Sequence, residues 1–402
     1  MGSLQGLEEV THLYKFYGAK AKCLYTGTLN RSSGVYALKR MDLKNYFAER
    51  RTTFTEQKKS VIDYSIFDFN HVPEKPLIRE ETKQIVDALV RYEKTDIPTN
   101  QVIFGSRGSG KTLTMKYLSR LLKEDSSLHI VYVNVRYYST SFKILAHLLG
   151  TRARGSSLSE LYSRFREKYP SKTVVVLDEV HLWSPKERQR ELLYFLSRDK
   201  RNYLVIMLSN DPRFLGEIDQ SVKSTLQPEL IHFQNYNANE VASILNACAK
   251  RGLRRPNTAT NGQIAAFTVK EANSDVRVAI KALFYWATHG RSQVEKCFVN
   301  ARKDIYVDLV ADLSETNLLI LKAATSINDT FAKKVFTTYT DLARQNNETS
   351  CSYVHFYNQL SYLQSLGLVM MLSTKVNKTY ANRISVLCNG QIIKEIYNLR
   401  FQ

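Results

Sequence analysis

The sequence has few of the features that mark exported or membrane-embedded proteins. Its 402 residues include five cysteines, none of them in a CxxC pair, and its eight histidines add no metal-ligand spacing. Its apolar runs, such as those at 174–177, 204–208 and 366–372, are far too short to cross a bilayer. The N-terminus has no charged start that leads into an apolar run. We therefore expect reduced thiols in a reducing compartment, no secretory signal and no membrane partner.

Acidic side chains are scarce relative to basic ones. The chain has 38 Asp and Glu against 57 Lys and Arg, which gives a formal net charge of +19. Such an excess favours a polyanionic partner, either nucleic acid or an anionic surface, and says nothing about the fold. With 44% hydrophobic residues and roughly 150 residues per domain, the chain has material for two or three globular domains.

Short apolar runs alternate with amphipathic segments between about residues 67 and 233. The expected strands lie at 101–104, 129–135, 173–177, 203–208 and 230–233. The expected helices between them lie at 112–122, 158–168 and 187–197. This alternation is typical of a parallel α/β sheet with helices on both faces.

Beyond residue 236 the pattern becomes helical. Helices are expected at 240–251, 261–271 and 276–287, and a further unit begins near Asp304. In that unit the expected elements are helices at 315–324, 333–345 and 353–366, then strands at 369–373 and 382–387. We predict four parts: a basic N-terminal extension to which we assign no fold (1–65), an α/β core (66–235), a helical lid (236–303) and a C-terminal unit (304–402).

The clearest motif is a phosphate-binding loop. It reads Gly105-Ser106-Arg107-Gly108-Ser109-Gly110-Lys111-Thr112, which matches GxxxxGK[ST] in full between an expected strand and an expected helix. Its glycines let backbone N–H groups turn toward a phosphate, and the helix N-terminus adds its positive dipole end. Lys111 would reach the β- and γ-phosphates, and the Thr112 hydroxyl would bind Mg²⁺. The loop predicts a site for ATP or ADP with Mg²⁺.

Two further strands deliver polar side chains at their carboxyl ends. Asp178 and Glu179 follow the apolar strand at 173–177, and Asn210 follows the next strand. Asp178 would hold the magnesium, and Glu179 would polarise an attacking water. Asn210 could bond the γ-phosphate or that water without adding charge. Each residue alone could be an ordinary strand-end or turn residue.

Together, these motifs resemble an AAA+ ATPase, and more narrowly the archaeal initiators related to the origin recognition complex and to cell-division-cycle loader subunits. The resemblance rests on motifs in order at 71–80, 105–112, 133–136, 177–179, 209–210, 233–236 and 274–279. It runs from about residue 67 to near the C-terminus. It implies an AAA+ P-loop parallel-sheet core with a helical lid, followed by a C-terminal winged helix that binds origin DNA.

The resemblance also implies roles for individual residues. Arg277 matches a lid arginine that senses the γ-phosphate, and Tyr236 matches a tyrosine at the nucleotide. Arg152 and Arg154 lie near an insertion that touches DNA in the family. Read without the resemblance, Arg277 is equally a solvated arginine, Tyr236 a packing residue and the 150–155 segment a solvated basic loop.

The sequence departs from the family's pattern at three positions. His181 stands where an Asp often follows the acidic pair, and Cys248 replaces a lid arginine. Ser221 replaces the arginine that would contact a neighbour's nucleotide, with Lys223 as the only substitute nearby in sequence. We therefore expect tight nucleotide binding and slow hydrolysis, with the nucleotide acting as a switch.

The C-terminal pattern resembles a winged helix-turn-helix even without the family. Its second helix, at 353–366, would offer polar side chains to a DNA major groove, where amides pair with adenine. Its wing would offer basic side chains to phosphates or to the minor groove. The DNA-contact candidates are Tyr353, His355, Asn358, Gln359, Lys375, Lys378 and Arg383.

These observations favour a nucleotide-regulated replication initiator that binds double-stranded origin DNA and recruits or loads the replicative helicase, beside paralogous initiator subunits. We expect it in the cytoplasm at the nucleoid, or in the nucleus of a eukaryotic source. One alternative is a signalling or transcription-type P-loop ATPase whose winged helix docks protein partners. Another is a motor ATPase, which the serine at position 221 disfavours.

Overall fold

The computed structural model describes residues 60–401, apart from 152–154, 170–171, 185, 188, 212–213, 290–292, 329 and 377–378. All described residues belong to one compact unit. The predicted extension 1–65 therefore lies almost wholly outside the described residues. Among the described residues, no helix is both long and apolar enough to span a membrane.

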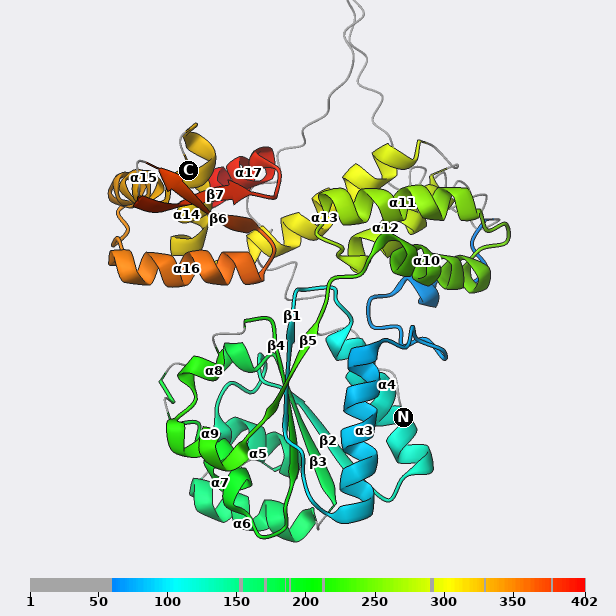
Figure 1. Ribbon diagram of the computed structural model, residues 1–402. Coiled ribbons are helices and arrows are strands. Elements are labelled where there is room, and N and C mark those ends of the chain that lie inside the picture. The colour runs from blue at the N-terminus through cyan, green and yellow to red at the C-terminus, as the bar shows by residue number, and fades with distance from the viewer. Residues whose placement is uncertain are drawn as a thin grey trace, which may run out of the picture. The chain divides into compact units, whose positions relative to one another are not determined.

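A five-stranded parallel sheet forms the centre of the P-loop part of the chain (Figure 1). Its strands are β1 (Gln101–Gly105), β2 (His129–Asn134), β3 (Thr173–Asp178), β4 (Leu204–Ser209) and β5 (Glu229–Phe233). They lie in the order β2-β3-β4-β1-β5, and every neighbouring pair is parallel. All five strands predicted from the sequence are present, within one residue at each end.

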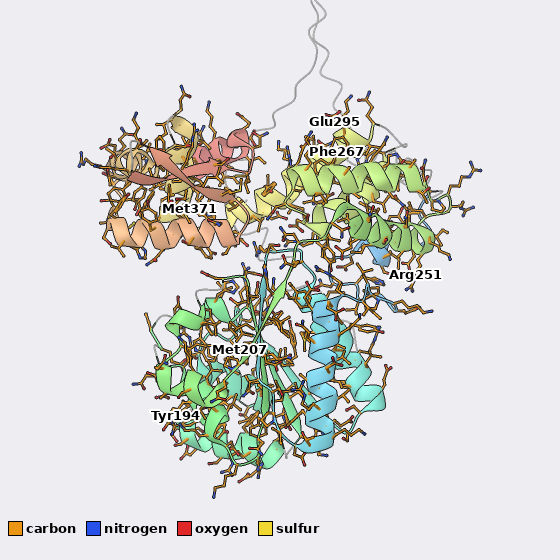
Figure 2. The ribbon with its side chains drawn as sticks, in the orientation of Figure 1. Tyr194, Met207, Arg251, Phe267, Glu295 and Met371 are labelled. Carbon is orange, nitrogen blue, oxygen red and sulfur yellow. The ribbon has the colours of Figure 1, made fainter. Side chains whose placement is uncertain are left out.

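Strands β3 and β4 are mostly apolar and fully buried, which suits their place inside this sheet. Every residue of both strands is buried, as expected of strands covered on two faces. Met207, in β4, is fully buried among the surrounding side chains (Figure 2). Leu177 pairs with Met207, so the carboxyl ends of β3 and β4 adjoin each other. This register brings the residues that follow the two strands to one edge of the sheet.

Helices cover both faces of the sheet (Figure 1). One apolar cluster joins the sheet to α3 (Glu80–Thr95) and α4 (Lys111–Asp125). The other face packs on α5 (Ser141–Leu149), α6 (Leu158–Lys168), α7 (Glu191–Arg198), α8 (Phe214–Glu217) and α9 (Gln220–Leu226). The predicted α6 begins at a capping box, in which Ser157 and Glu160 satisfy each other's backbone N–H groups.

The sequence placed the start of α7 wrongly, at residue 187. The helix begins at Glu191, because the Glu187 carboxylate is used elsewhere. It accepts hydrogen bonds from the Ser141 backbone N–H (2.8 Å) and from the Trp183 indole N–H (3.1 Å). Glu187 thereby caps the N-terminus of α5, a helix that the periodicity did not predict.

Four helices follow β5: α10 (Ala238–Gly252), α11 (Thr258–Glu271), α12 (Val276–Thr288) and α13 (Val294–Ala311). They share one apolar core with Val61, Ile66 and Phe67, which lie in and around the short 3₁₀ helix η1 (Ser65–Phe67). The first three were predicted within three residues at each end. The predicted boundary near Asp304 falls inside α13, an 18-residue helix that passes through that position.

The remaining elements are α14 (Glu315–Ser326), α15 (Ala332–Gln345), α16 (Tyr353–Ser365), β6 (Val369–Val376), β7 (Thr379–Val386) and α17 (Gly390–Phe401). Strands β6 and β7 pair as an antiparallel hairpin, and they share a core with the helices. Three helices followed by a hairpin form the winged helix-turn-helix order that the sequence predicted. Lys375 lies within β6 and not between the strands, so both strands are longer than predicted.

Candidate nucleotide-binding site

The predicted phosphate-binding loop connects β1 to α4. Gly110 occupies the N-cap of α4 with φ 94°, and Gly108 has φ 78°, both in the left-handed region that favours glycine. A Cβ atom at Gly110 would also collide with the Tyr236 hydroxyl. The conformation and the close approach of Tyr236 both require glycine here. The loop therefore presents backbone N–H groups at the start of a 15-residue helix.

Lys111 is buried beneath this loop. Its Nζ donates to the carbonyl oxygens of Gly105 (2.8 Å) and Ser106 (2.9 Å). Burial lowers the pKa of Lys111 to about 8, although the nearby Asp178 carboxylate acts in the opposite direction. A bound phosphate would restore the pKa by supplying negative charge to the ammonium group. Lys111 is thus placed to stabilise an anion bound in the loop.

Asp178 lies at the end of β3 with both carboxylate oxygens hydrogen-bonded. Thr112 Oγ1 donates to Asp178 Oδ2 (2.9 Å), and the Tyr132 hydroxyl donates to the same oxygen. The Glu179 backbone N–H donates to Oδ1 (2.8 Å). Asp178 is only 2% exposed, so these bonds hold the side chain in one orientation. Tyr132 is a residue of this site that the sequence did not reveal.

Glu179, Asn210 and His181 form the edge of the site beyond β3 and β4. Glu179 and Asn210 both line the cavity described below. Glu179 has φ 56° and ψ 40°, a left-handed conformation that is strained for a residue with a side chain. The backbone N–H of Asn210 donates to Nδ1 of His181 (3.3 Å). Burial lowers the pKa of His181 to about 4, so its ring is neutral at neutral pH.

Arg277 enters the site from the first turn of α12. Its Nε donates to Asp275 Oδ1 (2.9 Å), and Asp275 also caps the helix by accepting from the Arg277 backbone N–H (3.0 Å). Burial lowers the pKa of Arg277, but the ion pair with Asp275 outweighs burial and raises it overall. A Cβ atom at Gly108 would collide with the Asp275 carboxylate, so this ion pair lies against the phosphate-binding loop.

One cavity of about 290 Å³ is lined by most of these residues, with Asp178 and His181 outside its lining. Its polar side is lined by residues of the loop, by Glu179, by Asn210 and by Arg277. Its apolar side is formed by residues 66–77 and by lid residues that include Ile244, Cys248 and Ile280. A polar end with phosphate-binding geometry and an apolar end fit a nucleotide with its base in the apolar part.

Tyr236 closes the cavity beside the loop. It is 8% exposed, and the Arg79 guanidinium lies over its ring at 4.6 Å from the ring centre. Burial raises the pKa of its hydroxyl, while Arg79 acts in the opposite direction. Cys248 also lines the cavity, and burial raises the pKa of its thiol to about 11, so the thiol stays protonated. The motif at 71–80 is part of the family resemblance, but no residue of 66–77 was predicted to line the nucleotide site.

The predicted DNA-contact residues lie on α16, on strands β6 and β7, and in part outside the described residues. Tyr353, His355 and Asn358 are exposed on α16, and Gln359 is half-buried with its amide 2.9 Å from His355 Nε2. Arg383 is exposed on β7, where its Nε donates to Thr330 Oγ1 (3.4 Å). Arg152, Arg154 and Lys378 lie outside the described residues, as does the side chain of Lys375.

Comparisons with known proteins agree with this geometry. A family described as an AAA domain matches residues 98–215, the stretch that holds the phosphate-binding loop, Asp178 and Asn210. The ORC1-type DNA replication protein 1 of Sulfurisphaera tokodaii is 28% identical over 333 residues, which cover 75% of this chain and 83% of that protein. Residues 98–215 of this chain thus match an AAA domain, and most of the chain is similar to an archaeal ORC1-type DNA replication protein.

Two solved structures share the fold. The Aeropyrum pernix ORC1 protein, solved in complex with DNA, superposes with a TM-score of 0.64 and 19% identity over 85% of this chain and 98% of that one. The Aeropyrum pernix ORC2 protein, solved as ADPNP and ADP complexes, gives a TM-score of 0.57 and 22% identity over 85% and 99%. The predicted AAA+ fold is therefore confirmed.

Proposed function

We propose that this protein is a replication initiator that binds ATP or ADP with Mg²⁺ and binds double-stranded origin DNA in a sequence-specific way. Its nucleotide acts as a conformational switch and is hydrolysed slowly, and the DNA-bound protein helps to recruit or load the replicative helicase. The observation that carries this proposal is a cavity lined by the loop, Glu179, Asn210 and Arg277 together. The kinship with ORC1-type DNA replication proteins supports the biological role.

Magnesium fits the donor set at the loop. Thr112 Oγ1 and Asp178 Oδ2 lie 2.9 Å apart, a hydroxyl and a carboxylate of the kind that Mg²⁺ selects. Magnesium keeps several water ligands, so two protein oxygens and the phosphates suffice. When bound, the ion would neutralise charge on the β- and γ-phosphates. Thr112 and Asp178 would hold it, and Tyr132 would keep Asp178 oriented.

Each of the remaining side chains would have its own role in hydrolysis. Lys111 would neutralise the phosphates from below the loop, and Arg277 would exchange Asp275 for the γ-phosphate. Glu179 would orient the attacking water, and Asn210 would bond either that water or the γ-phosphate. Slow turnover follows from α9, where Ser221 stands in place of an arginine and hydrogen-bonds Asp219. Lys223, in the same helix, is the candidate to act toward a neighbouring subunit's nucleotide.

DNA binding is assigned to the winged helix. The exposed His355 and Asn358 stand in the first two turns of α16, the part of a recognition helix that reaches base edges. The net charge of +19 supports a nucleic-acid partner over an uncharged one. The proposed partners are origin DNA, the helicase and paralogous initiator subunits, and we place the protein at the nucleoid in the cytoplasm.

One observation favours the alternative that the winged helix docks a protein. Val354, in the first turn of α16, is 74% exposed, and Met370 and Leu372 on β6 are also exposed. An apolar surface of this kind is typical of a protein interface. In that case the chain would be a signalling or transcription-type ATPase that keeps the nucleotide switch but does not select DNA.

Binding to labelled double-stranded DNA fragments separates the two functions. Asn358→Ala should weaken binding to a specific site by about 1–3 kcal/mol, the cost of one lost base contact. The matched control is Gln364→Ala, an exposed amide nearer the other end of α16. Affinity should also fall steeply between 50 and 200 mM salt, by on the order of a thousandfold for six phosphate contacts. Equal and weak binding by both variants, without salt dependence, would instead support protein docking.

A further inference from the structure

His181 contacts a backbone group whose position matters for the proposed chemistry. It lies in η2 (Val180–Leu182), the short 3₁₀ helix that follows Glu179. Its Nδ1 accepts the hydrogen bond from the Asn210 backbone N–H at 3.3 Å. Unlike Glu179 and Asn210, His181 is not among the residues that line the cavity. The imidazole thus acts from behind the residues that face the nucleotide.

The hydrogen bond determines the state of the imidazole ring. An N–H donor requires an unprotonated acceptor, so Nδ1 carries no proton and the proton resides on Nε2. Burial of the ring keeps it neutral, since its pKa is lowered to about 4. The acceptor is therefore available at neutral pH.

The contact links the ends of β3 and β4 beyond the last pair of residues in their ladder. Glu179 follows β3 and Asn210 follows β4, and the ladder between these two strands ends at Leu177–Met207. His181 is two residues from Glu179 in the chain and bonds directly to Asn210. The bond thereby ties the backbone at Asn210 to the segment that carries the Glu179 carboxylate.

We propose that His181 is a positioning residue for hydrolysis, which holds Asn210 in register with Glu179 through the Nδ1 acceptor. This inference rests on the proposed function, because it assumes that Asn210 faces the γ-phosphate. It does not require His181 to touch the nucleotide. It predicts that the hydrogen-bond acceptor matters at position 181, whereas the basicity of the ring does not.

Two substitutions separate this role from simple packing. His181→Leu keeps an apolar side chain of similar size but removes the acceptor. His181→Asn keeps an acceptor, because its Oδ1 can occupy roughly the place of Nδ1. Each is made in the full chain, alone and together with Asn210→Ala. Circular dichroism and thermal melting confirm that the variants fold.

The first measurement is single-turnover hydrolysis with protein in excess over ATP, which detects slow chemistry. His181→Leu should lower the rate about tenfold, as expected when a partly buried N–H loses its acceptor. His181→Asn should stay within about threefold of the wild type. In the Asn210→Ala background, His181→Leu should cause little further loss, because both changes remove the same contribution.

The second measurement does not depend on turnover. It compares the affinity for a non-hydrolysable ATP analogue with the affinity for ADP, as a ratio. His181→Leu should reduce this ratio while leaving ADP affinity unchanged, and His181→Asn should preserve it. Equal losses in the Leu and Asn variants, or additive losses with Asn210→Ala, would overturn the positioning role. So would a loss of ADP affinity in His181→Leu. Failure of the wild-type chain to bind ADP would instead reject the proposed function itself.

Discussion

Removal of the Tyr132 hydroxyl tests how Asp178 is held at the end of β3. Tyr132, on the edge strand β2, donates to Asp178 Oδ2, and its pKa is raised by burial and by Asp178, so it remains a donor. A hydrogen bond to an ionised group is worth about 1.5–3 kcal/mol. Tyr132→Phe should therefore lower the free energy of unfolding of the P-loop core by about that amount.

A second tyrosine provides the matched control. The Tyr203 hydroxyl donates to a neutral acceptor, the Tyr169 carbonyl oxygen, at 2.9 Å. Tyr203→Phe removes the same atom but should cost only about 0.5–1.5 kcal/mol. The assay is urea denaturation followed by tryptophan fluorescence in a Trp286→Phe background. The remaining tryptophan, Trp183, then reports on the P-loop core, in which it is buried.

The two variants should also differ in the Mg²⁺ concentration that nucleotide binding requires. Tyr132→Phe loosens the carboxylate that would bind the ion, so a higher Mg²⁺ concentration should be needed for half-maximal nucleotide binding. Tyr203→Phe should leave that concentration unchanged. Equal destabilisation by the two changes, together with an unaltered Mg²⁺ requirement, would refute the claim that Tyr132 orients Asp178.

Three further predictions concern the loop and the lid. Gly110→Ala should abolish binding of a fluorescent ADP analogue, because the new Cβ would collide with the Tyr236 hydroxyl and the backbone there is left-handed. Retained affinity for the analogue would contradict the loop geometry. The pKa of Lys111 is lowered to about 8, so above pH 8 the side chain is partly neutral, and binding of nucleotide phosphates should make it take up a proton. Calorimetry at pH 9 in buffers of different ionisation enthalpy should detect this proton uptake. The uptake should be absent in Lys111→Met. Asp275→Asn should tighten binding of an ATP analogue relative to ADP by freeing Arg277 from its ion pair, and an unchanged ratio of the two affinities would argue against exchange of Asp275 for the γ-phosphate.

Much of the core could be predicted from sequence because its signals are local. The strands β1 to β5 are short apolar runs, and the helix after the loop is marked by the glycine motif. Asp178 and Asn210 could be placed at one sheet edge because parallel strands end together. Arg277 and Tyr236 could be assigned only by resemblance, since a single arginine or tyrosine carries no such signal.

Contacts between distant segments could not be predicted in this way. Glu187 caps α5 across 46 residues, so the helix expected at 187 begins at Glu191. The hydrogen bond from Asn210 to His181 depends on the β3–β4 register and on the turn at Glu179. The apolar wall at 66–77 depends on packing of η1 against the lid, which the motif at 71–80 does not by itself predict.

Selection of genomic DNA fragments by the purified full-length protein at physiological salt tests the central claim most directly. The selection is run with ATP and with ADP, beside the Asn358→Ala and Gln364→Ala variants. A replication initiator should enrich a few intergenic sites, with different affinities in the two nucleotides, and should lose them in Asn358→Ala alone. Uniform retention of all fragments, the same with ATP and ADP and in both variants, would contradict the account.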